Sequence, residues 1–107
     1  MTLYLISFDD GTMIIPEGEL PAVAAASHQV VDEAERAGVW VFGAGVERQR
    51  ATMVATDGTV SEGPYPETKS VIGGFSVLDV PSLDQALEWA AKFAAACRCT
   101  QEVREIM

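Results

Sequence analysis

The feature that most restricts the fold of this chain is a pair of short segments that are apolar on nearly every residue. Residues 3–8 read Leu-Tyr-Leu-Ile-Ser-Phe, and residues 39–42 read Val-Trp-Val-Phe. Successive side chains of a β-strand point to opposite faces of its sheet, so a run without alternation predicts a strand that is buried on both faces. Any fold for this chain therefore has to cover both faces of these two strands.

Two segments have the spacing of amphipathic helices. Pro21 begins the first, where its missing N–H costs nothing, and Gly38 stands where a glycine ends a helix. The second begins at the capping box of residues 82–85, and we expect Glu88 and Lys92 to pair one turn apart on its outer face. The predicted core stripes are Val23, Ser27, Val30, Val31, Ala34 and Ala37 in the first helix, and Leu83, Ala86, Leu87, Ala90 and Ala94 in the second.

Four further strands complete the pattern. Residues 51–56 and 59–61 flank Asp57-Gly58, a dipeptide typical of a type I′ hairpin turn with φ > 0 at both positions. Residues 74–80 form an apolar strand, and the charges in residues 100–106 suit the exposed edge of a sheet. The order of elements predicts an α+β fold, a ferredoxin-like β-α-β-β-α-β unit with an extra hairpin, as one domain over residues 1–107.

The two helices cover one face of this antiparallel sheet, and nothing left in the chain covers the other. The simplest cover is the sheet of a second copy in a two-fold symmetric dimer. We therefore predict a homodimeric α+β barrel with the sheets facing each other. Trp89 and Phe93 lie beside the stripe of the second helix, either within a broad core face or as a contact with the partner or the wall of a pocket.

Charge and composition exclude several functions. The net charge of -9 repels phosphate backbones and anionic lipid, so neither nucleic acid nor a membrane is an expected partner. We see no apolar run that could span a bilayer and no basic region typical of a signal peptide, which predicts the cytoplasm. Cys97, Cys99 and His28 are too few for a structural zinc site, so we expect two reduced thiols and no metal.

The loop of residues 62–69, Glu-Gly-Pro-Tyr-Pro-Glu-Thr-Lys, resembles the signature Asp-Gly-Pro-Phe-x-Glu-Thr-Lys of the YCII-related proteins, often called DGPF proteins. Glu62 stands in place of the family aspartate and Tyr65 in place of the phenylalanine. The resemblance extends over nearly the whole chain and implies a dimeric ferredoxin-like α+β barrel. It is also carried by residues 37–39, 73–75, 78–81 and 83–90.

A branch of that family has a histidine in the first helix and a later aspartate, proposed as an acid–base pair. His28 lies in the corresponding helix, but the distance to the closing glycine would put Ser27 at the family's position, and no aspartate matches near the end of the second helix. Histidine titrates nearest neutral pH, and Asp32 lies one turn later, within reach for orienting the ring. His28 is either a solvated side chain on the helix flank or a general acid–base group at the mouth of the dimer cleft.

The loop itself has two interpretations. It either caps the barrel and orders the hairpin, or it forms a polar pocket. In such a pocket Glu67 is an acid–base or anchoring group, Lys69 a clamp for an anion and Tyr65 a stacking wall. Arg48 and its neighbour Arg50 are either solvated or bind a substrate carboxylate.

The resemblance implies a small-molecule enzyme of lyase or isomerase type that needs no cofactor, with dehydrochlorinases as the family activity to extrapolate from. His28 and Glu67 are its acid–base candidates. The expected substrate-binding residues are Glu62, Tyr65, Lys69 and Arg48. The alternative is a non-catalytic ligand-binding or regulatory module, since family members occur beside or fused to extracytoplasmic-function sigma factors. Convergence of His28, Glu67 or Lys69 on one pocket would favour the enzyme.

Overall fold

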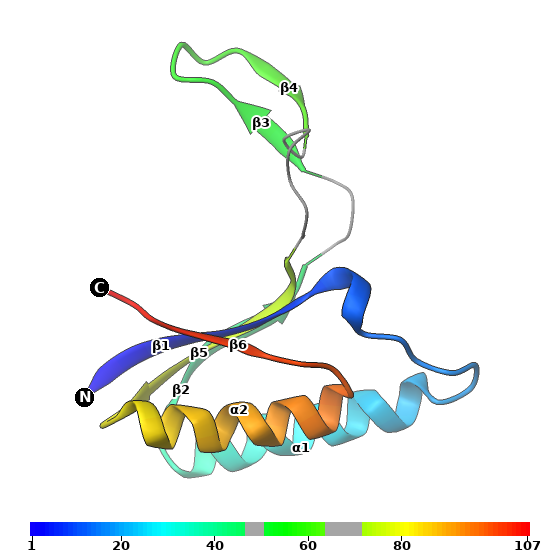
Figure 1. Ribbon diagram of the computed structural model, residues 1–107, viewed down its shortest axis with the longest axis vertical. Coiled ribbons are helices and arrows are strands. Elements are labelled where there is room, and N and C mark those ends of the chain that lie inside the picture. The colour runs from blue at the N-terminus through cyan, green and yellow to red at the C-terminus, as the bar shows by residue number, and fades with distance from the viewer. Residues whose placement is uncertain (47–50, 64–71) are drawn as a thin grey trace.

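The computed structural model describes residues 1–46, 51–63 and 72–107, and the candidates Arg48, Tyr65, Glu67 and Lys69 lie outside this part of the chain. The described elements follow the predicted order (Figure 1). They are β1 (Thr2–Asp9), the short 3-10 helix η1 (Asp10–Thr12), α1 (Leu20–Arg36), β2 (Trp40–Gly45), β3 (Thr52–Val54), β4 (Val60–Glu62), β5 (Ile72–Val80), α2 (Leu83–Cys97) and β6 (Glu102–Glu105).

The main sheet has four strands in the order β2-β5-β1-β6, and each neighbouring pair is antiparallel. The helices α1 and α2 lie side by side on one face of this sheet (Figure 1). This arrangement confirms the predicted α+β, ferredoxin-like fold, with the charged strand β6 at an edge.

The helix ends follow from local chemistry. Gly38 adopts φ 75°, its N–H donates to the carbonyl of Glu35 over 3.0 Å, and the N–H of Val39 donates to the carbonyl of Ala34 over 3.1 Å. These two bonds are the pattern of a Schellman motif, which needs a left-handed residue where glycine stands. At the start of α2 the hydroxyl of Ser82 accepts the N–H of Gln85 over 3.3 Å, as the capping box predicted.

Between the helices and the sheet lies the hydrophobic core. Tyr4 and Ile6 of β1 and Leu78 and Val80 of β5 face the helices and are almost completely buried. The buried residues of α1 are Val23, Val30 and Ala34, all on the predicted stripe. In α2 the prediction was partly wrong, because the buried residues are Ala86, Ala90, Phe93, Ala96 and Cys97 whereas the predicted Leu83 and Leu87 are exposed.

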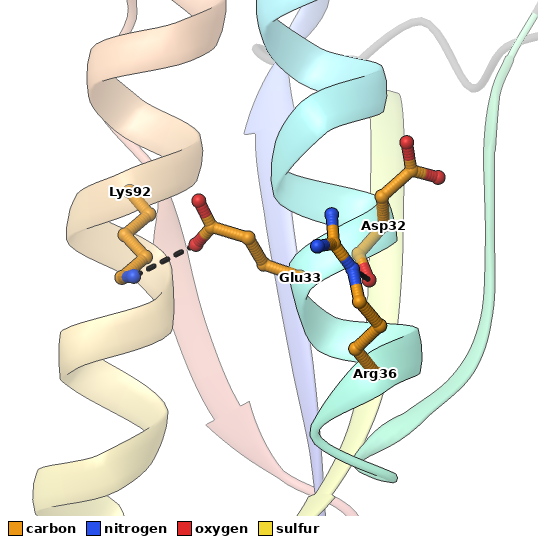
Figure 2. Close-up of polar contacts among 4 residues, drawn as sticks. All are labelled: Asp32, Glu33, Arg36 and Lys92. Atoms are coloured by element: carbon orange, nitrogen blue, oxygen red, sulfur yellow. Dashed lines mark hydrogen bonds and ion pairs between the residues drawn. The ribbon is translucent and has the colours of Figure 1, made fainter.

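The helices are also joined by charge at the protein surface (Figure 2). Lys92 of α2 donates to the Glu33 carboxylate of α1 over 2.8 Å, and its ammonium lies 5.1 Å from the centre of the Trp89 ring. The expected pairing with Glu88 within α2 was therefore wrong, since Lys92 turns to the neighbouring helix. Neither helix in the described part of the chain is long and apolar enough to cross a membrane.

On the opposite face of the sheet, the described residues form no helix (Figure 1). Its apolar side chains remain partly in solvent in this subunit: Leu3 is 37% exposed and Phe42 is 57% exposed. Phe42 packs on Phe75 of β5, with ring centres 5.8 Å apart, and pairs with Val77 in the register of β2 and β5. We refer to the surface made by Leu3, Leu5, Phe42, Phe75 and Val77 as the open face.

The strands β3 and β4 form a separate two-stranded sheet, the β3–β4 hairpin. Its turn is not of type I′, because only Gly58, at φ 90°, has a positive φ. Ala55 accepts the N–H of Gly58 over 2.9 Å and donates its own N–H to Thr59 over 2.8 Å, which is a three-residue loop with a glycine bulge. The Asp57 carboxylate accepts the N–H of Thr59 over 2.8 Å, which stabilises this longer loop.

Candidate functional site

A cleft of about 360 Å³ lies between the helices and one end of the main sheet. Residues from both helices and three strands form its walls, so it exists only after the chain has folded. The lining residues include Ser27, His28 and Val31 of α1, Ile6 and Phe8 of β1, Trp40 and residues 43–45 of β2, Phe75 and Ser76 of β5, and Phe93 and Cys97 of α2.

Two aromatic side chains owe their positions in this cleft to glycines. A Cβ atom on Gly43 would lie 2.5 Å from Cη2 of Trp40 and 2.8 Å from the carbonyl oxygen of Phe75. A Cβ atom on Gly74 would lie 2.7 Å from the ring of Phe8. All three distances are shorter than packed atoms allow, so only glycine lets these rings lie this close to the strands.

Aromatic rings from the sheet and from α2 also meet in the cleft wall. The rings of Trp40 and Phe93 have centres 6.3 Å apart and are tilted by 36°. Phe93 is therefore both a core residue and part of the pocket wall, two of the roles that its sequence position left open. A surface of this kind favours flat, apolar parts of a ligand, because aromatic rings attract one another in tilted or offset arrangements.

His28 stands at the rim of the cleft and is exposed to solvent. Within the described residues its ring makes no hydrogen bond, and the expected orienting contact with Asp32 is absent. The backbone carbonyl of Asp32 accepts from Arg36 Nε over 3.3 Å (Figure 2). An exposed imidazole without a fixed partner can exchange protons with a bound molecule and with water, but its orientation is not determined by the described part of the chain.

Ser27 lies deeper than His28 in the same wall. Its hydroxyl is 3.4 Å from the thiol of Cys97, and either group can donate. The helix thus brings both candidates for the family's histidine position, Ser27 and His28, to the cleft. Ser76 from β5 and Gln101, which precedes β6, supply further hydrogen-bonding groups.

No Asp, Glu, Lys or Arg is among the described residues that line the cleft. With hydroxyl, thiol, amide and imidazole groups as its polar members, this lining suits an uncharged or weakly acidic ligand that forms hydrogen bonds. A fully ionised ligand would lose its hydration there without meeting an opposite charge in the described lining.

The other candidate residues are not brought together with His28 by the described structure. Glu62 is the last residue of β4 and is exposed, on a hairpin that projects from the side of the sheet opposite the helices (Figure 1). Arg48, Tyr65, Glu67 and Lys69 lie outside the described residues, so convergence of the loop on the cleft stays a prediction.

Both cysteines are free thiols, as expected. Cys97 is buried in the cleft wall, and Cys99 is half-buried beside Gln101, whose amide donates to the Cys99 carbonyl over 3.4 Å. Burial raises the pKa of the Cys99 thiol, which keeps it protonated and weakly nucleophilic at neutral pH. Among the residues that the structure describes, no group of three His, Cys, Asp or Glu side chains is placed to hold a metal ion.

The sequence did not indicate the cleft that residues 43–45 line. Gly43, Trp40, Phe8 and Ser76 were not among the candidates. One signal was available, because a glycine inside an apolar strand indicates the close approach of another group. The residue that approaches could not be identified from spacing alone.

The sequence matches the model of a known protein family over almost the full length of the chain. Residues 3–107 match the model of the YCII-related domain. No curated protein matches the chain in sequence.

Among solved structures, the fold is similar to that of 5-chloro-2-hydroxyhydroquinone dehydrochlorinase (TftG) from Burkholderia phenoliruptrix, in complex with 2,5-dihydroxybenzoquinone. The TM-score is 0.51 at 16% sequence identity, and the match covers 98% of this chain and 93% of that chain. At this identity the likeness concerns the fold.

Proposed function

Because the chain belongs to the family of proteins with a YCII-related domain, we propose that it is a cofactor-independent enzyme for small molecules, of lyase or isomerase type. The observation that carries this proposal is an aromatic-walled cleft with the chain's one histidine at its mouth. His28 is the proposed acid–base group, and the cleft is the proposed active site.

The proposed substrate is a small ring with oxygen substituents. A volume of about 360 Å³ is at the lower end of the usual range for ligand pockets. Trp40 and Phe93 provide faces for a flat ring, and Ser27 and Ser76 provide hydroxyls for its oxygens. TftG is named for a chlorinated hydroxyhydroquinone and was solved with a dihydroxybenzoquinone, and both compounds are single rings of this kind.

Acid–base groups alone suffice for the proposed chemistry. When HCl is eliminated from a chlorinated hydroquinone, the proton of one hydroxyl first moves to the ring carbon that bears chlorine, and that hydroxyl becomes a carbonyl. A second hydroxyl then loses its proton and becomes the other carbonyl, a new C=C bond forms at the chlorine-bearing carbon, and the C–Cl bond breaks with its electrons on chloride, which gives a quinone and HCl without an oxidant. The His28 imidazole would accept the proton of the second hydroxyl. Glu67 is the proposed second acid–base group. Glu62, Tyr65, Lys69 and Arg48 are proposed to hold the substrate.

Chloride release and quinone absorbance from a panel of chlorinated and hydroxylated hydroquinones would test the activity. We expect His28→Gln to lower kcat by about a hundredfold or more, the range of general acid–base catalysis. Gln29→Ala is the matched control, since Gln29 is the exposed neighbour of His28 in α1 and is not part of the cleft lining. Full turnover by His28→Gln would contradict the role of His28, and no turnover of any ring by the unaltered protein would contradict the enzyme.

We also propose that the protein is a homodimer in which the open faces of two subunits meet. Leu3 and Phe42 leave apolar area in water that a second sheet would cover, and a two-fold axis lets each subunit cover the other. Sedimentation at micromolar concentration should give twice the chain mass of 11.4 kDa. Phe42→Lys should shift the protein toward the monomer, and a monomeric unaltered protein would refute the proposal.

One observation favours the alternative of a non-catalytic ligand-binding or regulatory module. A catalytic base is usually held in place by a second group, and His28 has no such partner among the described residues. In that case the cleft binds the same rings without converting them, and the acidic surface serves a basic protein partner in the cytoplasm, such as an extracytoplasmic-function sigma factor. Ring binding by calorimetry without any turnover would favour this function.

A further inference from the structure

The β3–β4 hairpin extends away from the rest of the subunit (Figure 1). It stands on the side of the main sheet opposite α1 and α2, and the longest dimension of the molecule, 43 Å, runs in this direction. The radius of gyration is 15.4 Å, whereas a compact domain of this length has about 13 Å. The residues of the β3–β4 hairpin, about a tenth of the chain, therefore lie outside the compact body formed around the hydrophobic core. We refer to this hairpin as the arm.

This hairpin lacks what an isolated hairpin needs for stability. Each of its strands has three residues, and β3 and β4 pack mainly on each other. Val54 and Val60 lie directly opposite one another in the ladder and are 67% and 64% exposed. A two-stranded hairpin is at best marginally stable in water, so a surface that covered these two exposed valines would stabilise it.

The geometry points to a second copy of this chain as that surface. The hairpin rises on the same side of the sheet as the open face, where Leu3 and Phe42 are also exposed. A sheet packed on the open face would lie about 10 Å away, on the side to which the hairpin projects (Figure 1). The partner's body would thus stand directly beside the arm, and two-fold symmetry would give each subunit one arm on the other.

The charge of the chain agrees with this occupant. Two copies that each carry a net charge of -9 repel one another except where uncharged surfaces meet. The side chains of the valine pair and the five side chains of the open face are themselves uncharged. A basic partner protein would instead be bound by carboxylates, and the paired valines would contribute nothing to that contact.

We propose that the β3–β4 hairpin is an exchanged arm, which packs Val54 and Val60 against the body of a second copy of this chain. The proposal rests on the homodimer proposed above and extends its interface beyond the open face. It predicts that the arm becomes ordered by dimerisation and that its valines contribute directly to the dimer dissociation constant.

A paired set of variants tests the arm. Val54→Lys with Val60→Lys places two charges on the proposed contact, and Thr56→Lys with Ser61→Lys adds the same charges elsewhere on the hairpin, at positions that are also exposed. Because all four side chains lie outside the core, we expect both variants to fold, as circular dichroism would show. Sedimentation velocity over a dilution series should give a dissociation constant raised about tenfold or more in the valine variant and changed by less than about threefold in the control.

Every outcome of this series decides for or against the arm. A selective loss of dimer in the valine variant supports it, even if Phe42→Lys leaves the dimer intact and the open face fails as an interface. Equal dissociation constants for the valine variant and the unaltered protein overturn it, as does equal weakening by both double variants. An unaltered protein that stays monomeric also overturns it, whereas turnover of rings by that monomer would leave the proposed enzyme standing.

Discussion

Gly43 offers the sharpest test of how the sequence builds the cleft. Replacing it by alanine adds one methyl group, at a site where that methyl would lie 2.5 Å from the Trp40 ring and 2.8 Å from the Phe75 carbonyl oxygen. The carbonyl belongs to β5, which pairs with β2 at this point, so it cannot retreat without distorting the ladder. The Trp40 ring therefore has to move, and it moves away from its place in the cleft wall.

The magnitude follows from two opposing effects. Adding a methyl group to a tightly packed site typically costs about 1–3 kcal/mol. Alanine recovers about 0.5–1 kcal/mol of that, because glycine loses more conformational freedom when it enters a strand. We expect Gly43→Ala to lower the free energy of unfolding by about 1–2 kcal/mol, which for a domain of this size lowers Tm by roughly 4–16 °C.

The matched control lies two residues along the same strand. A Cβ atom on Gly45 would have nothing within 4 Å, so Gly45→Ala should leave Tm unchanged or raise it slightly. Thermal denaturation of both variants gives the comparison. Fluorescence in a Trp89→Phe background isolates Trp40, since the chain has two tryptophans, and a red shift is expected in Gly43→Ala alone.

The reasoning would be refuted if the two alanine variants melted within about 2 °C of each other, because the shift expected for an overpacked site is larger than this. It would also fail if Gly43→Ala lost stability while the Trp40 emission stayed unchanged. In that case the strain would have been relieved in the backbone and the aromatic wall would not depend on the glycine.

Two further predictions concern the contacts that tie the helices together. Arg98 ends α2 with a left-handed backbone, at φ 59°, and donates to the Glu19 carboxylate over 2.6 Å. Arg98→Gly and Arg98→Ala both lose this exposed ion pair, but only glycine relieves the backbone strain, so urea titrations should show Arg98→Gly to be more stable by about 1 kcal/mol. Equal stabilities of the two variants would contradict the strain. The hydrogen bond from Lys92 lowers the pKa of Glu33 in the folded protein below its usual value of 4.5. The ionised carboxylate therefore stabilises the fold at pH values above 4.5, and this contribution is lost as the pH falls through the lower pKa of the folded state. Urea midpoints of the unaltered protein and Glu33→Gln should therefore converge below pH 4.5, and a constant gap from pH 6 to pH 3 would show that the ion pair has no such role.

Local patterns predicted much of the fold correctly because their causes are local. Gly38 ends α1 because its left-handed backbone satisfies two carbonyls of the last turn, and Ser82 begins α2 because its hydroxyl accepts a free N–H. The turn at Gly58 was predicted in place but not in type. Its geometry depends on whether the Asp57 side chain accepts the N–H of Thr59, which adds one residue to the loop.

Contacts between segments that lie far apart in the chain could not be predicted from the sequence. Lys92 was predicted to pair within its own helix and instead binds Glu33, because α1 lies within reach of the same ammonium group. The core stripe of α2 was placed too close to Leu83 and Leu87, while Phe93 faces the core and the cleft. Helical spacing fixes which residues share a face, and the packing of helix on sheet decides which of several apolar faces is buried.

The order of strands and helices, the two strands with apolar side chains on both faces and the family of the chain were all present in the sequence. They followed from side-chain alternation, from capping groups and from a distinctive loop, each of which acts over a few residues. Tertiary structure alone decided that Gly43 and Gly74 make room for two aromatic rings, that Ser27 and His28 share a cleft with Phe93 and Cys97, and that the hairpin stands clear of the body. These features depend on distances between segments far apart in the chain, which become fixed when the helices pack on the sheet.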